Sequence, residues 1–191
     1  MKVAALLSGG VDSSVALRLM HDRGHEITAY YLKIWLEDEL SFLGTCPWEE
    51  DVEFIRKTCD PLGIPLEVLS LQREYHEEIV AYATGELHAG RTPSPDVFCN
   101  QLIKFGRFFE RIGAGFDRVI SGHYAKIDRA GGGARLLRSP DPVKDQTYFL
   151  SHLNLEQLQR IDFPLGPYDK TQVRRMAAEM GLSNASRKDS Q

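Results

Sequence analysis

The residues best suited to chemistry follow the first apolar run of the chain, at Ser8-Gly9-Gly10-Val11-Asp12-Ser13-Ser14. We call residues 8–14 the phosphate loop. Its two glycines allow close approach of backbone to ligand, its serines supply hydroxyls, and a following helix would present N–H groups to an anion. Asp12 would repel that anion, so the pattern favours a nucleotide bridged to the carboxylate by Mg²⁺. A plain strand-to-helix turn with Ser or Asp as N-cap is the alternative.

Neither of two common phosphate fingerprints occurs in the chain. The G-x-x-x-x-G-K-[ST] pattern is absent, and Gly113-Ala114-Gly115 lacks the third glycine and the following helix of a dinucleotide turn. Ordinary P-loop kinases are therefore excluded.

A second candidate site follows two prolines, in the run from Gly90 to Phe105. Pro93 and Pro95 predict a stiff loop over residues 91–98, and Cys99 then falls near the start of a helix expected over 99–113. A helix N-terminus lowers the pKa of a thiol, whereas the nearby Asp96 carboxylate raises it. Cys99 is thus a candidate nucleophile with Asp96 as candidate acid or base. A small buried hydrophobe is the alternative for Cys99, and it is the interpretation we keep for Cys46 and Cys59.

The elements around these residues predict an α/β fold with a doubly wound parallel sheet. Expected strands cover 3–7, 27–34, 66–71 and 118–120, and expected helices begin after the phosphate loop and cover 49–62, 74–88 and 99–113. A hairpin is expected over 124–129 and 134–138, followed by helices over 145–153, 155–161 and 170–180. The proline and glycine residues of 163–167 predict a boundary between a catalytic domain, 1–165, and the start of a second region, 166–191.

Composition limits the class of protein. A chain of 191 residues with 42% hydrophobic positions can bury a self-supporting core. Three cysteines without metal-ligand spacing favour a reducing compartment and no bound metal cluster, and no run approaches the ~20 apolar residues of a membrane span. We therefore expect a cytoplasmic protein without membrane contact, or a mitochondrial or plastid protein in a eukaryote. The net charge of -4 is unevenly spread: 12 acidic and 3 basic residues fall in 37–78, and 16 basic and 12 acidic residues fall in 79–191. Local phosphate contacts remain compatible with such a distribution.

Four motifs together resemble a known family. The Ser8–Ser13 loop resembles that of the PP-loop ATP pyrophosphatases, with their adenine nucleotide alpha hydrolase-like fold. The runs 90–105, 121–124 and 144–150 follow it in the order seen in tRNA-specific 2-thiouridylases, which convert a wobble uridine to 2-thiouridine. The resemblance covers essentially the whole chain, and it implies ATP and Mg²⁺ as cofactors, and tRNA and a sulfur-donor protein as partners.

The resemblance also assigns roles to residues. It implies ATP contacts from Leu6, Leu7, Ser8, Gly9, Gly10, Val11, Asp12, Ser13, Leu32 and Gly122. Ser94, Pro95 and Asp96 would touch the target base, where the family usually has Asn in place of Ser94. Lys144, Asp145 and Gln146 would contact the tRNA, and Cys99 and Asp96 would be catalytic. Tyr148 is a possible stacking surface, Phe149 and Leu150 are expected in a helix core, and His123 receives no chemical role.

The family's second cysteine, which carries sulfur as a persulfide, follows a Lys-Asp-Ser motif, and here Lys188-Asp189-Ser190 is followed only by Gln191. We therefore expect an N-terminal fragment of a tRNA thiouridylase. Two other hypotheses stay open: a PP-loop enzyme that adenylates a small molecule, and a non-catalytic nucleotide- or tRNA-binding module.

Overall fold

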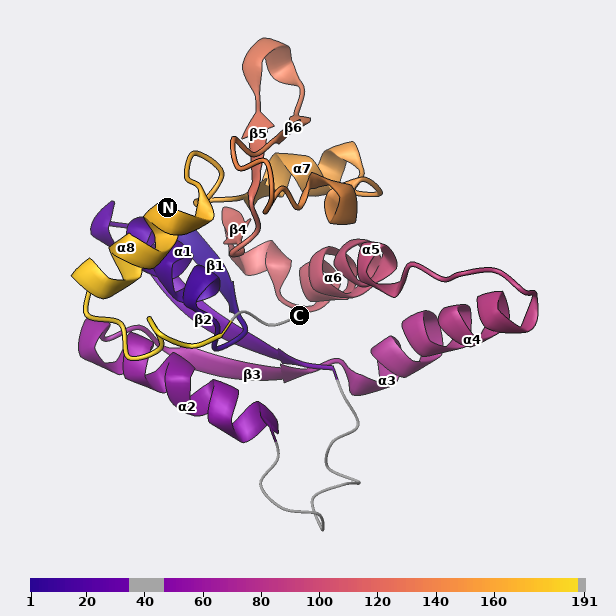
Figure 1. Ribbon diagram of the computed structural model, residues 1–191, viewed down its shortest axis with the longest axis horizontal. Coiled ribbons are helices and arrows are strands. Elements are labelled where there is room, and N and C mark those ends of the chain that lie inside the picture. The colour runs from indigo at the N-terminus through magenta and orange to yellow at the C-terminus, as the bar shows by residue number, and fades with distance from the viewer. Residues whose placement is uncertain (35–46, 189–191) are drawn as a thin grey trace.

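Five parallel strands form the centre of the molecule (Figure 1). The computed structural model describes residues 1–34 and 47–188. The sheet has the order β3-β2-β1-β4-β7. Its strands are β1 (Lys2–Leu7), β2 (Glu26–Lys33), β3 (Leu66–Ser70), β4 (Arg118–Ile120) and β7 (Ile161–Asp162). The predicted parallel sheet is confirmed, and its first four strands lie where the sequence indicated.

Side chains of β1 alternate between two hydrophobic clusters, so both faces of the sheet are covered. Ala4 and Leu6 pack on the face that also buries Phe105 and Phe108, whereas the odd-numbered residues of β1 pack on the face of Leu17 and Ile55. Helices α1 (Val11–Asp22) and α2 (Pro47–Cys59) cover the second face. This arrangement is the predicted doubly wound one, and it explains why β1 is a continuous apolar run.

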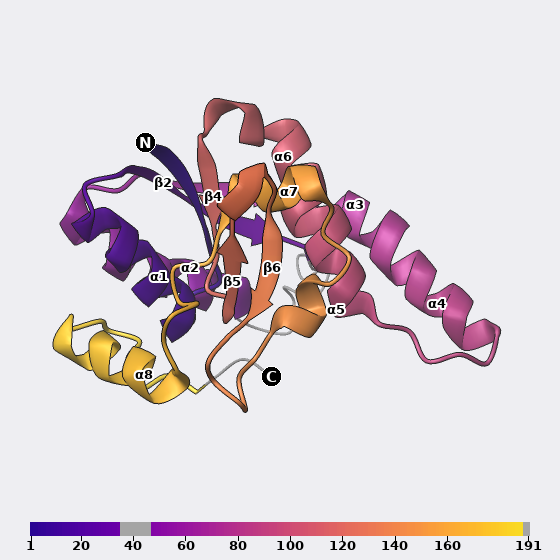
Figure 2. The ribbon, with the colours of Figure 1, turned by 90° about the horizontal axis from the view of Figure 1, so that it is seen from above.

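The long helical segment on the other face begins earlier than predicted. Helix α5 (Pro95–Phe98) continues into a π-helix (Cys99–Arg107) and then into α6 (Phe108–Arg111). The predicted loop over 91–98 was therefore wrong for its last four residues, because Pro95 occupies the first helical turn, where a missing N–H costs nothing. Before it, α3 (Gln72–Tyr75), a π-turn (His76–Val80) and α4 (Ala81–His88) form one projecting segment (Figures 1 and 2).

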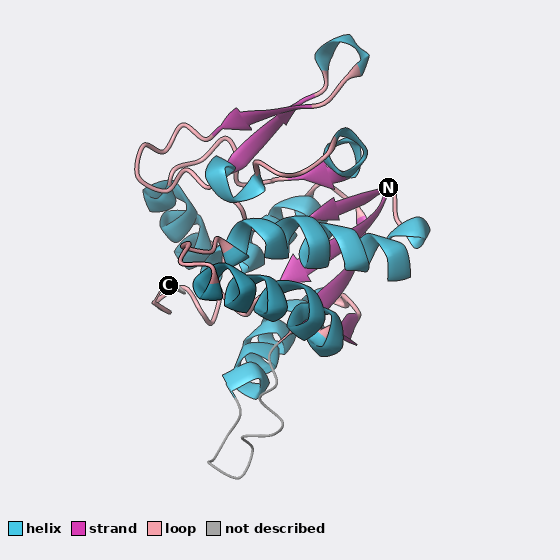
Figure 3. Ribbon diagram, turned by 90° about the vertical axis from the view of Figure 1, so that its right-hand side faces the viewer, coloured by secondary structure: helices cyan, strands magenta, loops and turns pink. Residues whose placement is uncertain are grey.

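The region after β4 contains the predicted hairpin and two corrections. Strands β5 (Ala125–Asp128) and β6 (Arg135–Arg138) pair antiparallel and stand off from the sheet (Figure 3). The helix predicted over 145–153 is only a 3₁₀ turn (Thr147–Leu150). Helix α7 (Leu155–Arg160) ends before Ile161, which was predicted as helical. Ile161 is instead extended, as part of β7, and pairs with Val119 of β4. A two-residue strand is too short to show alternation in the sequence.

The last described helix, α8 (Lys170–Glu179), packs on α1. Val173 and Ala177 of α8 share a buried cluster with Val11 and Val15 of α1. The boundary proposed near residue 165 stays a prediction. Shorter 3₁₀ turns cover Asp60–Leu62, Gly113–Gly115 and Ala130–Gly132. Within 1–34 and 47–188, no helix is long and apolar enough to cross a membrane.

Candidate active site

A cavity of about 590 Å³ lies at the carboxyl ends of the central strands. Open parallel sheets bind ligands in this position, since strands end there and helices begin. Of the residues expected to bind ATP, the cavity is lined by Leu6, Leu7, Ser8, Asp12, Ser13, Leu32 and Gly122. Asp96, Cys99 and Gln146 line it too. Two motifs separated by more than 80 residues in the sequence therefore meet in one cavity.

The phosphate loop has a backbone that only glycine adopts readily. Gly9 has a φ of 72°, and a Cβ there would lie 2.8 Å from the Cα of Asp51 in α2. The Ser8 N–H donates to Ser13 Oγ at 3.3 Å, and Ser13 Oγ donates to the Gly10 carbonyl at 3.1 Å. Gly10 is the N-cap of α1 and makes no side-chain capping bond. Val11 follows it, and its side chain is buried in the core. The N-terminus of α1 is thus uncapped by side chains beside the cavity, as an anion site requires.

Gly122 supports this loop from the end of β4. A Cβ on Gly122 would lie 2.7 Å from the backbone nitrogen of Ser13, a distance that real Cβ atoms do not show. Glycine at this position therefore permits β4 and the phosphate loop to touch, which places Gly122 in the wall of the cavity.

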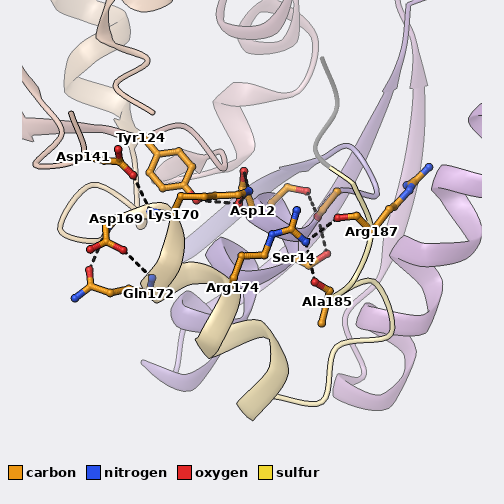
Figure 4. A network of polar contacts seen from close by, with 12 residues as sticks. Asp12, Ser14, Tyr124, Asp141, Asp169, Lys170, Gln172, Arg174, Ala185 and Arg187 are labelled. Atoms are coloured by element: carbon orange, nitrogen blue, oxygen red, sulfur yellow. Dashed lines mark hydrogen bonds and ion pairs between the residues drawn. The ribbon is translucent and has the colours of Figure 1, made fainter. Parts of the chain in front are cut away.

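Asp12 is held by a cation from the far end of the chain (Figure 4). Lys170 Nζ lies 2.7 Å and 2.9 Å from the two carboxylate oxygens of Asp12, and the Tyr124 hydroxyl donates to Oδ1 at 2.9 Å. Mg²⁺ was expected to neutralise Asp12, but Lys170 already places a positive charge beside this carboxylate. No cluster of three or more His, Cys, Asp or Glu residues suitable for a metal occurs in the described part of the chain. These residues do not fit a protein-held magnesium site.

A polar segment that includes Asn184 and Arg187 forms hydrogen bonds with the phosphate loop (Figure 4). The buried Asn184 amide donates to the Gly9 carbonyl and to Ser14 Oγ, both at 2.9 Å. Arg187 bonds the same carbonyl at 3.2 Å and pairs with Asp51 at 2.8 Å, while Arg174 donates to the carbonyls of Ala185 and Arg187. These roles, and that of Lys170, were not predicted from the sequence, because single polar residues 158 to 178 positions from the loop give no local pattern.

Cys99 opens the π-helix at the opposite side of the cavity, one turn after the exposed Asp96. Burial raises the pKa of the Cys99 thiol, Lys104 lowers it and Asp96 raises it, with a net increase. Of the two opposed effects expected from the sequence, the one that raises the pKa prevails, and burial adds to it as the largest cause. The helix begins at Pro95, so its first-turn N–H groups precede the thiol. Cys59, in contrast, is fully buried, and burial raises its pKa to about 12. Cys46 lies outside the described residues.

Polar groups surround Cys99. Asn100 is buried and its amide nitrogen donates to the carbonyls of Asp96 and Phe149, while its Oδ1 has no partner and the residue lines the cavity. His123 Nδ1 lies 2.8 Å from Ser121 Oγ. Burial and the nearby Lys104 hold the pKa of His123 well below its usual range, so this ring is neutral.

The residues expected to contact tRNA divide into two groups. Asp96 and Gln146 line the cavity, and Gln146 Oε1 accepts the Tyr124 N–H at 3.1 Å. Ser94, Pro95, Lys144 and Asp145 are partly exposed but do not line it. Asp145 accepts bonds from Thr147 and from Arg138, so its carboxylate fixes the local turn. Tyr148 is exposed, as a stacking surface requires, and Leu150 is buried as expected, whereas Phe149 is only partly buried.

Comparison with known proteins defines the family. The family described as "tRNA methyl transferase HUP domain" matches residues 1–191. The chain therefore belongs to this family.

Curated proteins with similar sequences share one name. The tRNA-specific 2-thiouridylase MnmA of Porphyromonas gingivalis is 46% identical over 191 residues, which are 100% of this chain and 53% of that protein. The protein of the same name from Alkaliphilus oremlandii is 45% identical over 190 residues, covering 99% of this chain and 52% of its own length. The resemblance to tRNA-specific 2-thiouridylases is thus confirmed. The chain spans about half the length of the curated relatives it matches.

Solved structures confirm the fold. The tRNA thiolase NcsA from Methanococcus maripaludis has a TM-score of 0.60 at 19% identity, covering 96% of this chain and 58% of its own. A 4-thiouridine synthetase, solved as an RNA complex with bound ATP, has a TM-score of 0.56 at 18% identity, covering 98% of this chain and 42% of its own. The predicted adenine nucleotide alpha hydrolase-like class is confirmed.

Proposed function

We propose that this chain forms the ATP-binding part of a tRNA 2-thiouridylase, which activates the C2 oxygen of a wobble uridine and replaces it with sulfur. The observation that carries the proposal is the shared cavity of the phosphate loop and Cys99. An enzyme that adenylates a base and then delivers sulfur to the same carbon needs both groups at one site. The names of the curated relatives agree with this chemistry.

In the first stage, the uridine C2 oxygen attacks the α-phosphate of ATP and pyrophosphate leaves. Phosphate oxygens would lie against the phosphate loop, where the Ser8 and Ser13 hydroxyls and the α1 N-terminus stabilise negative charge. Leu6, Leu7 and Leu32 give an apolar wall for the adenine ring. Mg²⁺ would enter with the nucleotide, coordinated mainly by its phosphates.

In the second stage, the outer sulfur of a cysteine persulfide would attack C2 and AMP would leave. The Cys99 thiolate would then attack the inner persulfide sulfur, so that the S–S bond breaks, 2-thiouridine is released and Cys99 forms a disulfide with the persulfide-carrying cysteine. An external thiol would reduce this disulfide before the next turnover. Cys99 would assist this transfer, and the exposed Asp96 would exchange the proton. The sulfur itself would come from a donor protein by way of a second, persulfide-carrying cysteine. Cys59 cannot serve, because it is buried in the core away from the cavity.

The target base would enter between Asp96 and Gln146, both of which line the cavity. Ser94 and Pro95 precede Asp96 at the rim, and Lys144 and Asp145 precede Gln146. The unpartnered Asn100 Oδ1 offers an acceptor for a base N–H. Because the named relatives come from bacteria, we infer a bacterial cytoplasmic protein rather than an organellar one.

ATP–pyrophosphate exchange with and without tRNA tests the proposal. Exchange that depends on tRNA is the expected result. Exchange that requires a small acid or amide instead would favour a small-molecule adenylating enzyme, and no exchange under either condition would favour a binding module.

A substitution separates the two stages. Cys99→Ser should leave ATP affinity unchanged in calorimetry, yet abolish 2-thiouridine formation by a form extended with the second half of its relatives. Mass spectrometry of digested tRNA measures the product. Thiolation at the wild-type rate would show that Cys99 is not the reactive thiol.

A further inference from the structure

The π-helix changes which side chains share a face with Cys99. Residues 99–107 form hydrogen bonds from i to i+5, so each turn holds about 4.4 residues instead of about 3.6. In an α-helix, a residue five positions after Cys99 would be rotated by about 140° from it. In the wider π-helix the rotation is only about 50°. Lys104 therefore lies on the thiol's side of the helix.

Two features maintain this wider turn. A Cβ on Gly106 would lie 2.9 Å from the carbonyl oxygen of Gln101, so glycine permits the close backbone approach. Gln157 Nε2 in α7 donates to the carbonyls of both Gln101 and Phe105 at 2.9 Å. A side chain inserted in this way supports a local departure from α-helical geometry. The π-helix is thus fixed by contacts with a neighbouring element.

Cys99 and Lys104 also line the same cavity, together with Asp96 and His123. Tyr75 of α3 packs in the hydrophobic cluster that includes Cys99. The titratable groups around the thiol are therefore Asp96 and Lys104 on its own helical segment, Tyr75 on α3 and His123 after β4. Lys104 is the positively charged member, since His123 is neutral and the other two are acids.

We propose that Lys104 is a positioning residue of the candidate active site, whose ammonium group lies beside Cys99 and stabilises its thiolate. This inference rests on the proposed role of Cys99 and extends it to a residue five positions away. Lys104 would affect the reaction only by stabilising the negative charge on the Cys99 sulfur atom.

The electrostatic environment agrees with this geometry. Burial raises the pKa of Cys99 and Lys104 lowers it, with a net increase. Burial lowers the pKa of Lys104, and Cys99 and Asp96 raise it, with a net decrease, so the thiol and the lysine each favour the charged form of the other against burial. Burial, with Cys99 and Asp96, raises the pKa of Tyr75 to about 12, so the phenol stays protonated. The lysine is the group that offsets a negative charge on Cys99.

Alkylation of Cys99 by iodoacetamide tests the proposal without ATP, tRNA or a sulfur donor. The rate would be followed between pH 6 and 10 on the Cys99 peptide by mass spectrometry. We expect Lys104→Gln to react about tenfold more slowly near neutral pH, with its pH profile moved to higher pH. Lys104→Arg, which keeps the charge, should stay within about twofold of the wild type.

Lys57→Gln is the matched control, because Lys57 pairs with Glu53 on the surface of α2 and should not affect the rate. An unchanged profile in Lys104→Gln, or an equal loss in Lys104→Arg, would overturn the proposal. If the Lys104→Gln variant fails to fold, the pH titration of the Lys104 side chain is followed by NMR in the wild-type protein instead. The Lys104 curve should contain an inflection at the pH where Cys99 ionises, and its absence would also overturn the proposal. Loss of tRNA-dependent exchange, in contrast, would refute the proposed function alone.

Discussion

Replacing Lys170 by methionine should destabilise the protein and weaken ATP binding together. The variant keeps most of the apolar length of the side chain but removes the cation 2.7 Å and 2.9 Å from the Asp12 oxygens. Tyr124 would remain as a hydroxyl donor to Asp12. The carboxylate would then carry an uncompensated negative charge beside the expected phosphate position.

The burial of the pair sets the size of the effect. The side chains of Lys170 and Asp12 are 19% and 24% exposed, between a surface pair and a fully buried one. Surface pairs contribute up to about 1 kcal/mol, and breaking a buried pair costs about 3–5 kcal/mol. We expect a loss of about 2 kcal/mol, which lowers Tm by roughly 4–8 °C in a chain of this size. Repulsion of the phosphates should weaken ATP binding about tenfold, or about 1.4 kcal/mol.

Calorimetry measures both quantities, unfolding by scanning and ATP affinity by titration. Lys57→Met, in an exposed pair on α2, is the matched control and should change neither. In the double variant Asp12→Asn/Lys170→Met, the losses should be smaller than the sum of the single losses, since the unpaired charge is gone. A Lys170→Met protein with wild-type Tm and wild-type ATP affinity would refute the reasoning.

Three further predictions concern the backbone around the cavity. Gly122→Ala should weaken ATP binding at least tenfold by titration calorimetry, since its Cβ would press on the phosphate loop, whereas Gly115→Ala has open space and should not. Gly106→Ala should lower the free energy of unfolding by about 1 kcal/mol in urea, contrary to the usual gain in helices, while Gly85→Ala in α4 should give that gain of roughly 0.5–1 kcal/mol. Asn184→Ala should cost about 1–3 kcal/mol by the same measurement, because two buried bonds to the phosphate loop are lost; an unchanged midpoint would contradict this role.

The sequence predicted the phosphate loop, because its residues and the two elements beside it are close together along the chain. The apolar run of β1, the glycines of the phosphate loop and the helix after it are neighbours in sequence and in space, so their order alone predicts the anion site. Cys99 was predicted as a candidate nucleophile from the prolines and the helix next to it in sequence, and it lines the same cavity. Its environment was not, because Pro95 begins the helix earlier than expected and the π-helical segment is held by Gln157 of α7, which is 52 and 56 residues from the carbonyls it contacts.

A long-range ion pair explains why the partner of Asp12 was not predicted from the sequence. Asp12 looked like a metal ligand because its partner, Lys170, is 158 positions away and stands in an ordinary amphipathic helix. A carboxylate in a phosphate loop implies a compensating charge, but the sequence does not say whether a metal or a lysine supplies it.

Two different lysines therefore act on the acidic groups of the candidate site. Lys170 compensates Asp12 at the phosphate loop, whereas Lys104 lies near Cys99 on the π-helix. Lys170 belongs to α8, which packs on α1, whereas Lys104 belongs to the π-helix, so the two lysines come from different elements. Separate compensation would allow the phosphate end to bind and release nucleotide without changing the ionisation of the thiol. In the proposed two-stage reaction, this independence would keep the thiol reactive after pyrophosphate has left.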